Sequence, residues 1–187
     1  MQQPEKSVFI SYRRTSGALA LLVYQHLTQN DYNVFLDNKA IGAGSFERVI
    51  LSQIEARPHF VLILTPSALE RCTSPEDWLR REIEHAIAKG RNIVPLMFEK
   101  FTYEDNTAYL TGQLAQLPRY NSLPVPSVSD PDYFNTTMTK LREQFLNKLP
   151  DAVLRPITDD QQSQAEAVMA SITPEDTPSE AALEAVS

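Results

Sequence analysis

Cysteines, long apolar runs and metal-ligand patterns are scarce in this sequence. Its single cysteine, Cys72, excludes an internal disulfide and suits a reducing compartment. No stretch approaches about 18 apolar residues, and residues 1–6 hold no apolar run of signal-peptide length, so we expect a cytoplasmic protein without a membrane segment. The absence of a Gly-x-x-x-x-Gly-Lys-Ser/Thr motif excludes a P-loop nucleotidase. The three histidines lack metal-ligand spacing: His26, His59 and His85.

A basic excess is also absent. The chain carries 24 acidic and 17 basic residues, and seven of the acids lie between Pro156 and Ser187, where there is no Lys or Arg. The net charge of −7 therefore belongs to this tail, and the near-neutral remainder argues against direct nucleic-acid binding. We expect an N-terminal extension over residues 1–6, a folded domain over 7–150, and an acidic, disordered linker or tail over 151–187.

Short apolar runs alternate with amphipathic segments along the folded part. The runs predict strands over residues 7–11, 32–36, 60–64 and 92–97, with a short fifth strand over 121–125. The amphipathic segments predict one helix after each of the first three strands and a last helix over 132–149. This order indicates an α/β, flavodoxin-like doubly wound fold: a mostly parallel five-stranded sheet with helices on both faces. Pro95 places the fourth strand near an edge or ends it early.

The helix before the fourth strand carries the most informative side chain. Ser74 is its predicted N-cap and Pro75 its predicted first residue, while an apolar face is formed by Leu79, Ile83, Ala86 and Ile87. Glu82 lies beside that face, one turn after Trp78, and no Lys or Arg lies three or four residues from it. A carboxylate beside an indole without a local cation is either a reactive group or a half-exposed helical glutamate.

Several boxes in the right order resemble the TIR (Toll/interleukin-1 receptor) domain family over roughly residues 6–149. The boxes are Val8-Phe9-Ile10-Ser11-Tyr12-Arg13-Arg14, Phe35-Leu36-Asp37 with Gly42-Ala43-Gly44 and Phe46, Phe60 to Leu69, Asp77-Trp78 with Glu82-Ile83, and Asn92-Ile93-Val94-Pro95. Within the family, the sequence is most similar to the NAD-cleaving branch, which includes the animal axon-degeneration TIR enzyme and bacterial antiphage TIR proteins. Receptor and adaptor TIR domains usually lack the arrangement seen here at Trp78 and Glu82.

The resemblance implies that Glu82 is the catalytic glutamate of an NAD+ glycohydrolase. NAD+ would be the substrate, and no metal or organic cofactor is expected. Nicotinamide is already cationic in NAD+, so it leaves without a general acid, and a carboxylate stabilises the oxocarbenium-like centre that remains. The expected products are nicotinamide and ADP-ribose or a cyclic variant.

Substrate contacts are expected beyond the carboxyl ends of the strands, where ligands of doubly wound sheets bind. The predicted substrate-binding residues, from this topology and from the resemblance, are Tyr12, Arg13, Arg14, Asp37, Gly44, Phe46, Ser67 and Trp78. Arg13 and Arg14 could instead be solvated surface charges, and Asp37 could cap the loop backbone. Ser11 is expected to pack and hydrogen-bond locally.

The resemblance also implies activation by self-association, with the 38–46 loop rearranged against a neighbouring protomer. It suggests the effector module of a bacterial defence or signalling protein, with other domains or TIR proteins as further partners. Gly42 departs from the pattern because the animal enzyme has a glutamate in this loop. The alternative is a non-catalytic TIR interaction or adaptor module. A phosphoacceptor receiver domain is excluded, because the first strand ends without paired acids.

Overall fold

The computed structural model describes residues 6–36 and 46–147. Three predictions therefore lie outside the described residues: those for the extension 1–6 (apart from Lys6), for the loop with Asp37, Gly42 and Gly44, and for the tail 151–187. Phe46 is the first residue of a described helix, but its side chain also lies outside the description.

The centre of the fold is a five-stranded sheet in the order β2-β1-β3-β4-β5. Every strand pair is parallel, so the predicted α/β class is confirmed and the sheet is fully rather than mostly parallel. The strands are β1 (Ser7–Ser11), β2 (Asn33–Leu36), β3 (His59–Leu64), β4 (Asn92–Met97) and β5 (Leu123–Pro124). The α-helices are α1 (Gly17–Gln29), α2 (Phe46–Glu55), α3 (Trp78–Ala88) and α4 (Pro131–Lys140).

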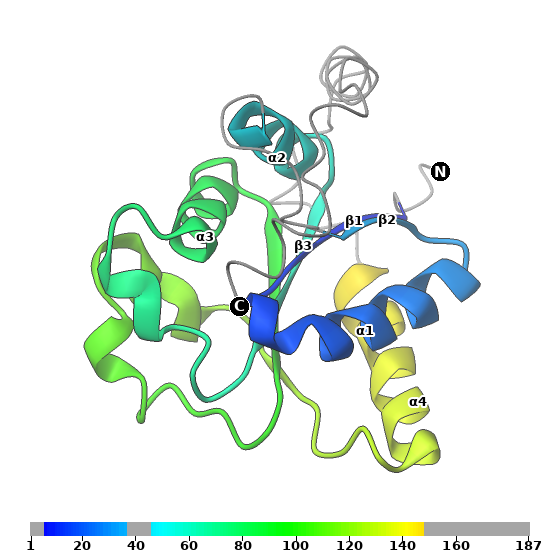
Figure 1. The fold of residues 1–187 in the computed structure, drawn as a ribbon. Helices are drawn as coiled ribbons and strands as arrows, with labels where there is room; N and C mark the ends of the chain where they lie inside the picture. The colour runs from blue at the N-terminus through cyan, green and yellow to red at the C-terminus, as the bar shows by residue number, and fades with distance from the viewer. Residues whose placement is uncertain (1–5, 37–45, 148–187) are drawn as a thin grey trace, which may run out of the picture.

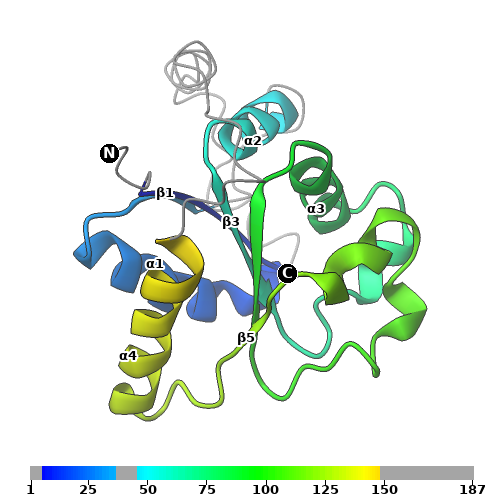
Figure 2. The ribbon, with the colours of Figure 1, turned by 180° about the vertical axis from the view of Figure 1, so that it is seen from behind.

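Helices cover both faces of the sheet, as Figures 1 and 2 show from opposite sides. Helices α1 and α4 pack on one face, where Val8 and Ile10 of β1 point, and α2 and α3 pack on the other, where Phe9 points. This division follows from the alternation of side chains along a strand. Short η turns complete the path: η1 (Arg14–Ser16), η2 (Glu70–Thr73), η3 (Thr107–Tyr109), η4 (Gly112–Arg119) and η5 (Leu141–Leu146).

The start of α3 differs from the prediction. Its N-cap is Asp77, whose carboxylate accepts a hydrogen bond from the backbone N–H of Arg80 at 3.2 Å. Ser74 instead accepts from the N–H of Glu76, within the turn before the helix. The predicted cap at Ser74 is therefore wrong, and Pro75 precedes the helix. Both residue types can cap a helix, so local sequence did not separate them.

The last helix begins close to its predicted position. Asp130 caps α4 by accepting hydrogen bonds from the N–H groups of Asp132 and Tyr133. The α-helical hydrogen bonds end at Lys140, and the chain continues as the π-helical turn η5. No helix in the described part of the chain is both long and apolar enough to cross a membrane.

Candidate functional site

The site lies where the carboxyl end of β1 meets the first turns of α3. Glu82 is 1% exposed and projects toward the sheet together with its helical neighbours Leu79 and Ile83. Ser11, the last residue of β1, is fully buried, and its hydroxyl donates a hydrogen bond to Oε2 of Glu82. The interpretation of Glu82 as a half-exposed helical glutamate is therefore wrong.

Strand alternation explains why Ser11 meets this helix. Ser11 is two residues after Phe9, so both side chains lie on the face of the sheet that α2 and α3 cover. Ser11 pairs with Leu62 of β3, which fixes its position at the centre of the sheet. A polar pair is thus placed inside an otherwise apolar layer, where electrostatic interactions are less screened than in water.

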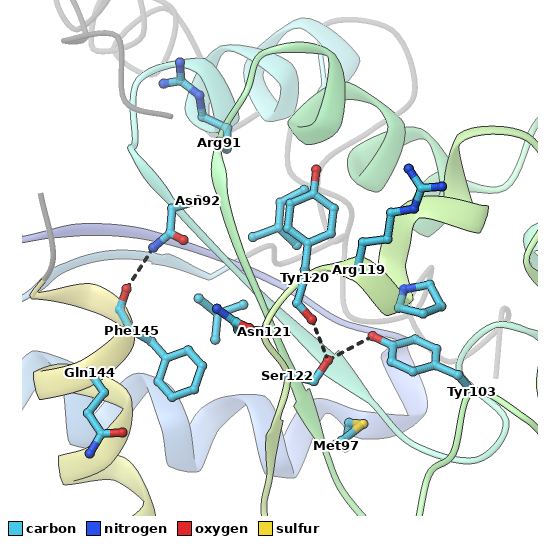
Figure 3. A pocket seen from close by; sticks show the side chains of 13 residues that line it. Arg91, Asn92, Met97, Tyr103, Arg119, Tyr120, Asn121, Ser122, Gln144 and Phe145 are labelled. Atoms are coloured by element: carbon cyan, nitrogen blue, oxygen red, sulfur yellow. Dashed lines mark hydrogen bonds between the residues drawn. The ribbon is translucent and has the colours of Figure 1, made fainter. Parts of the chain in front are cut away.

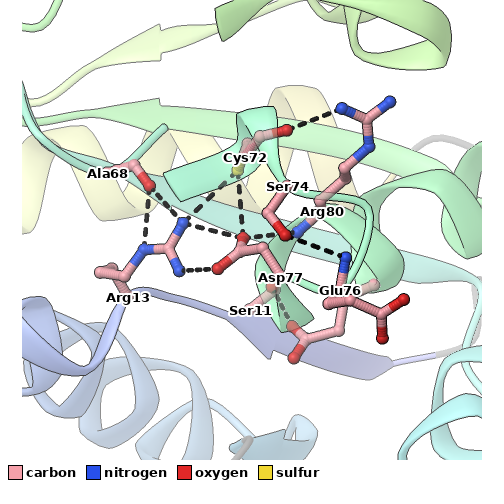
Figure 4. Close-up of polar contacts among 9 residues, drawn as sticks. Ser11, Arg13, Ala68, Cys72, Ser74, Glu76, Asp77 and Arg80 are labelled. Carbon is pink, nitrogen blue, oxygen red and sulfur yellow. Dashed lines mark hydrogen bonds and ion pairs between the residues drawn. The ribbon is translucent and has the colours of Figure 1, made fainter. Parts of the chain in front are cut away.

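A second polar cluster fixes the start of α3 (Figure 4). Arg13 donates to both carboxylate oxygens of Asp77, with Nη1–Oδ1 at 2.6 Å and Nη2–Oδ2 at 3.0 Å. It also donates to the carbonyl oxygen of Ala68, from Nε at 3.0 Å and from Nη2 at 2.7 Å. These bonds tie the segment after β1 to the segment after β3 and to the N-cap of α3. The same helix carries Glu82 one turn further on.

Burial and charge oppose each other in this cluster. Burial alone would lower the pKa of Arg13, but the hydrogen bond and charge of Asp77 outweigh it and the pKa is raised. Burial would likewise raise the pKa of Asp77, but Arg13 holds it below its usual value. Both groups are therefore ionised. Burial and the charge of Asp77 raise the pKa of the neighbouring Cys72 to about 12, so this thiol is no nucleophile near neutral pH.

The remaining residues predicted to contact substrate differ in the face of the sheet on which they lie and in their exposure. Trp78 is half-buried against the α2/α3 layer, and the guanidinium of Arg81 lies 5.3 Å from its ring centroid. Tyr12 is half-buried against the opposite layer, next to Gly17. Arg14 and Ser67 are exposed. The structure thus brings Arg13 and Trp78 to the same helix end as Glu82 and places Tyr12 across the sheet.

The contacts that the structure shows for Arg13 are to the protein. Its predicted contact with substrate stays a prediction, as do those of the other residues named for substrate binding. Asp37, Gly44 and the side chain of Phe46 lie outside the described residues.

A cavity of about 780 Å³ lies elsewhere, along the outer side of β4 (Figure 3). It is lined by residues 91–94, 118–122, 144 and 145 together with Met97 and Tyr103. β3 pairs along one edge of β4, whereas on the other edge β5 pairs only with Leu96 and Met97, so among the described residues no strand covers the outer edge of the earlier part of β4. Pro95 is therefore one strand from the edge, consistent with its predicted position. The cavity includes none of the predicted substrate-binding residues.

Two contributors to the site were missed from sequence. Ser11 was expected to bond locally, yet its partner Glu82 lies 71 positions away. Asp77 was named as part of the Asp77-Trp78 box and not as a cap, yet it is the N-cap of α3 and the ion-pair partner of Arg13. The sequence did hold one indication for Ser11. Side chains of a strand alternate between the two faces of the sheet, and Ser11 is a polar residue on the buried face that it shares with Phe9.

Comparisons with known proteins agree with the family resemblance of the sequence. Residues 8–121 match the TIR domain family. The Drosophila melanogaster protein "NAD(+) hydrolase sarm1" is 40% identical over 102 residues, which are 52% of this chain. "NAD(+) hydrolase tir-1" of Caenorhabditis elegans is 33% identical over 127 residues, or 66% of this chain, and "NAD(+) hydrolase SARM1" of Danio rerio is 34% identical over 120 residues, or 62%. The matches span 8%, 13% and 16% of these much longer relatives, respectively.

Proposed function

This chain belongs to the TIR domain family, and from that premise we propose that it hydrolyses the bond between nicotinamide and ribose in NAD+, with Glu82 as the catalytic carboxylate. The observation that carries the proposal is the burial of this carboxylate at the carboxyl end of a parallel sheet, where ligands of such folds bind. The names of the relatives, which are NAD(+) hydrolases, support the choice of substrate.

The chemistry needs little from the protein beyond position and charge. Nicotinamide is a cation in NAD+, so it departs as a neutral base without being protonated. The ribose carbon that it leaves develops positive charge, and a nearby carboxylate stabilises that charge most where water is excluded. Glu82 supplies the carboxylate, and Trp78 forms a wall that reduces hydration. Water then attacks the same carbon and gives up a proton to solvent, which yields ADP-ribose; attack by a ring nitrogen of the adenine, also with loss of one proton to solvent, yields a cyclic product.

The proposal extends to regulation. We propose that activity depends on self-association through TIR–TIR contacts and that the domain is the effector module of a bacterial defence or signalling protein. The near-neutral charge of residues 1–155 supports the first part, since it offers little repulsion to assembly.

Chromatography of NAD+ incubated with the protein tests the proposal. Glu82→Gln should lower the rate by about 10²–10³-fold or more, because it removes the group that stabilises charge in the transition state. Glu84→Gln is the matched control. Glu84 lies two residues further along α3, its side chain is 31% exposed, and it pairs with Arg80, so its loss should leave the rate within about twofold.

The same assay across protein concentrations tests assembly, since specific activity should rise with concentration. Retention of most activity by a folded Glu82→Gln variant would refute the assigned mechanism. If the wild-type protein releases no nicotinamide at any concentration, the proposal fails and the non-catalytic interaction module replaces it.

A further inference from the structure

We propose that Ser11 is a positioning residue for Glu82: its hydroxyl fixes the carboxylate in one orientation and keeps it ionised. The inference rests on the proposed function, in which Glu82 acts as a carboxylate. It begins from the hydrogen bond that Ser11 donates to Oε2 of Glu82 between two fully buried side chains. A serine at the end of a central strand is thereby linked to the residue proposed to face the reacting carbon.

Both partners of this bond are held by rigid elements. Ser11 is in register with Leu62 at the centre of the sheet. Glu82 lies in the second turn of α3, whose N-cap Asp77 is fixed by Arg13. A free carboxylate group rotates about its last torsion, and that torsion is broad in isolated side chains. A donor fixed in the sheet removes this freedom, so the negative charge is directed before substrate binds.

Within the described residues, three ionisable side chains near this pair have partners of their own. Arg13 pairs with Asp77 at the start of α3, and Arg81 pairs with Glu47 of α2. Further along α3, His85 lies 2.9 Å from Glu55 of α2. These interactions do not involve Ser11, so they persist when its hydroxyl is removed. A change in the titration of Glu82 in a Ser11 variant therefore reports the lost hydrogen bond.

The expected effect of removing the Ser11 hydroxyl follows from how hydrogen bonds and burial change the protonation of a carboxyl group. A hydrogen bond donated to a carboxylate favours its charged form, and burial favours the neutral form. Without the donor, Glu82 should take up a proton at higher pH, and the protonated acid stabilises a developing cation poorly. Ser11→Ala should therefore lower kcat by about 10–100-fold and move the acidic limb of the kcat profile upward by about one pH unit. KM should change little, because Ser11 is fully buried and is not among the residues expected to contact the substrate.

Two substitutions and one control separate this role from simple packing. Ser11→Thr keeps the hydroxyl on a side chain that suits a strand, so it should restore the acidic limb and most of kcat. If the added methyl group prevents folding, Ser11→Cys keeps the volume with a weaker donor and should give an intermediate limb. Ser16→Ala is the control, because Ser16 is also buried but its hydroxyl bonds to Thr65 Oγ1 at 3.2 Å.

The test combines the pH profiles with a direct titration. The Glu82 carboxyl signal is followed by ¹³C NMR in glutamate-labelled protein and assigned by its disappearance in Glu82→Gln. Support requires that Ser11→Ala shifts this titration upward, that Ser11→Thr or Ser11→Cys moves it back, and that Ser16→Ala leaves it in place. An unchanged titration in folded Ser11→Ala overturns the inference, even if NAD+ cleavage and its dependence on Glu82 stand. If the wild-type protein cleaves no NAD+, the proposed function fails, while the titration still decides whether Ser11 controls Glu82.

Discussion

The Arg13–Asp77 ion pair offers the sharpest test of how this site is held together. Arg13→Met keeps most of the side-chain volume but leaves the Asp77 carboxylate buried without its cation, since the Asp77 side chain is 4% exposed. Removing one partner of a buried pair costs about 3–5 kcal/mol of unfolding free energy. That is a large part of the roughly 5–15 kcal/mol that stabilises an ordinary domain. For a domain of this size, the melting temperature should fall by roughly 6–20 °C.

The assay is denaturant unfolding followed by circular dichroism, with the neighbouring arginine as a matched control. Arg14 is exposed, so Arg14→Met should change stability by no more than about 0.5 kcal/mol. Asp77→Asn retains a good helix cap and removes the charge, which allows a double-mutant cycle. The double variant should be more stable than the sum of the single changes predicts, with a coupling energy of about 1–3 kcal/mol.

Two results would refute this reasoning. If Arg13→Met is as stable as Arg14→Met, the ion pair does not hold α3 in place. If the cycle shows no coupling, the cost of Arg13→Met comes from its bonds to the Ala68 carbonyl rather than from Asp77.

Two further predictions concern protons in the same cluster. Because Arg13 holds the pKa of Asp77 below its unfolded value, the stability that this carboxylate contributes is present above about pH 4 and is lost as pH falls further. Wild-type protein should therefore lose more unfolding free energy than Asp77→Asn between pH 5 and 3, and equal losses would contradict the assignment. The Cys72 thiol, buried and with its pKa raised to about 12, should react with a disulfide reagent at pH 8 only as fast as the protein opens. Fast labelling of the native protein would show that this segment is exposed.

Sequence reasoning succeeded for the features that depend on a repeating pattern of apolar residues. The apolar run over Phe60–Leu64 predicts a central strand because each of these side chains must be buried on one face or the other, and β3 is buried throughout. Strands that alternate with helices form parallel pairs, because each helix returns the chain to the same end of the sheet. The sheet and its two helical layers were therefore predictable. The helix carrying Glu82 was also predictable, since Leu79, Ile83 and Ala86 recur at helical spacing.

The details of the site were decided by contacts across the sheet. Ser74 and Asp77 are equal candidates for the cap of α3 by residue type, and Arg13, 64 positions before Asp77, decides between them. Glu82 borders the apolar face of its helix, and the sequence of the helix alone does not determine whether its side chain points toward water or toward the sheet. Its burial depends on a donor at the end of β1, which the fold brings within hydrogen-bonding distance. Periodicity encodes which face of an element is buried, whereas the partner of a buried polar group is set by the three-dimensional packing of distant segments.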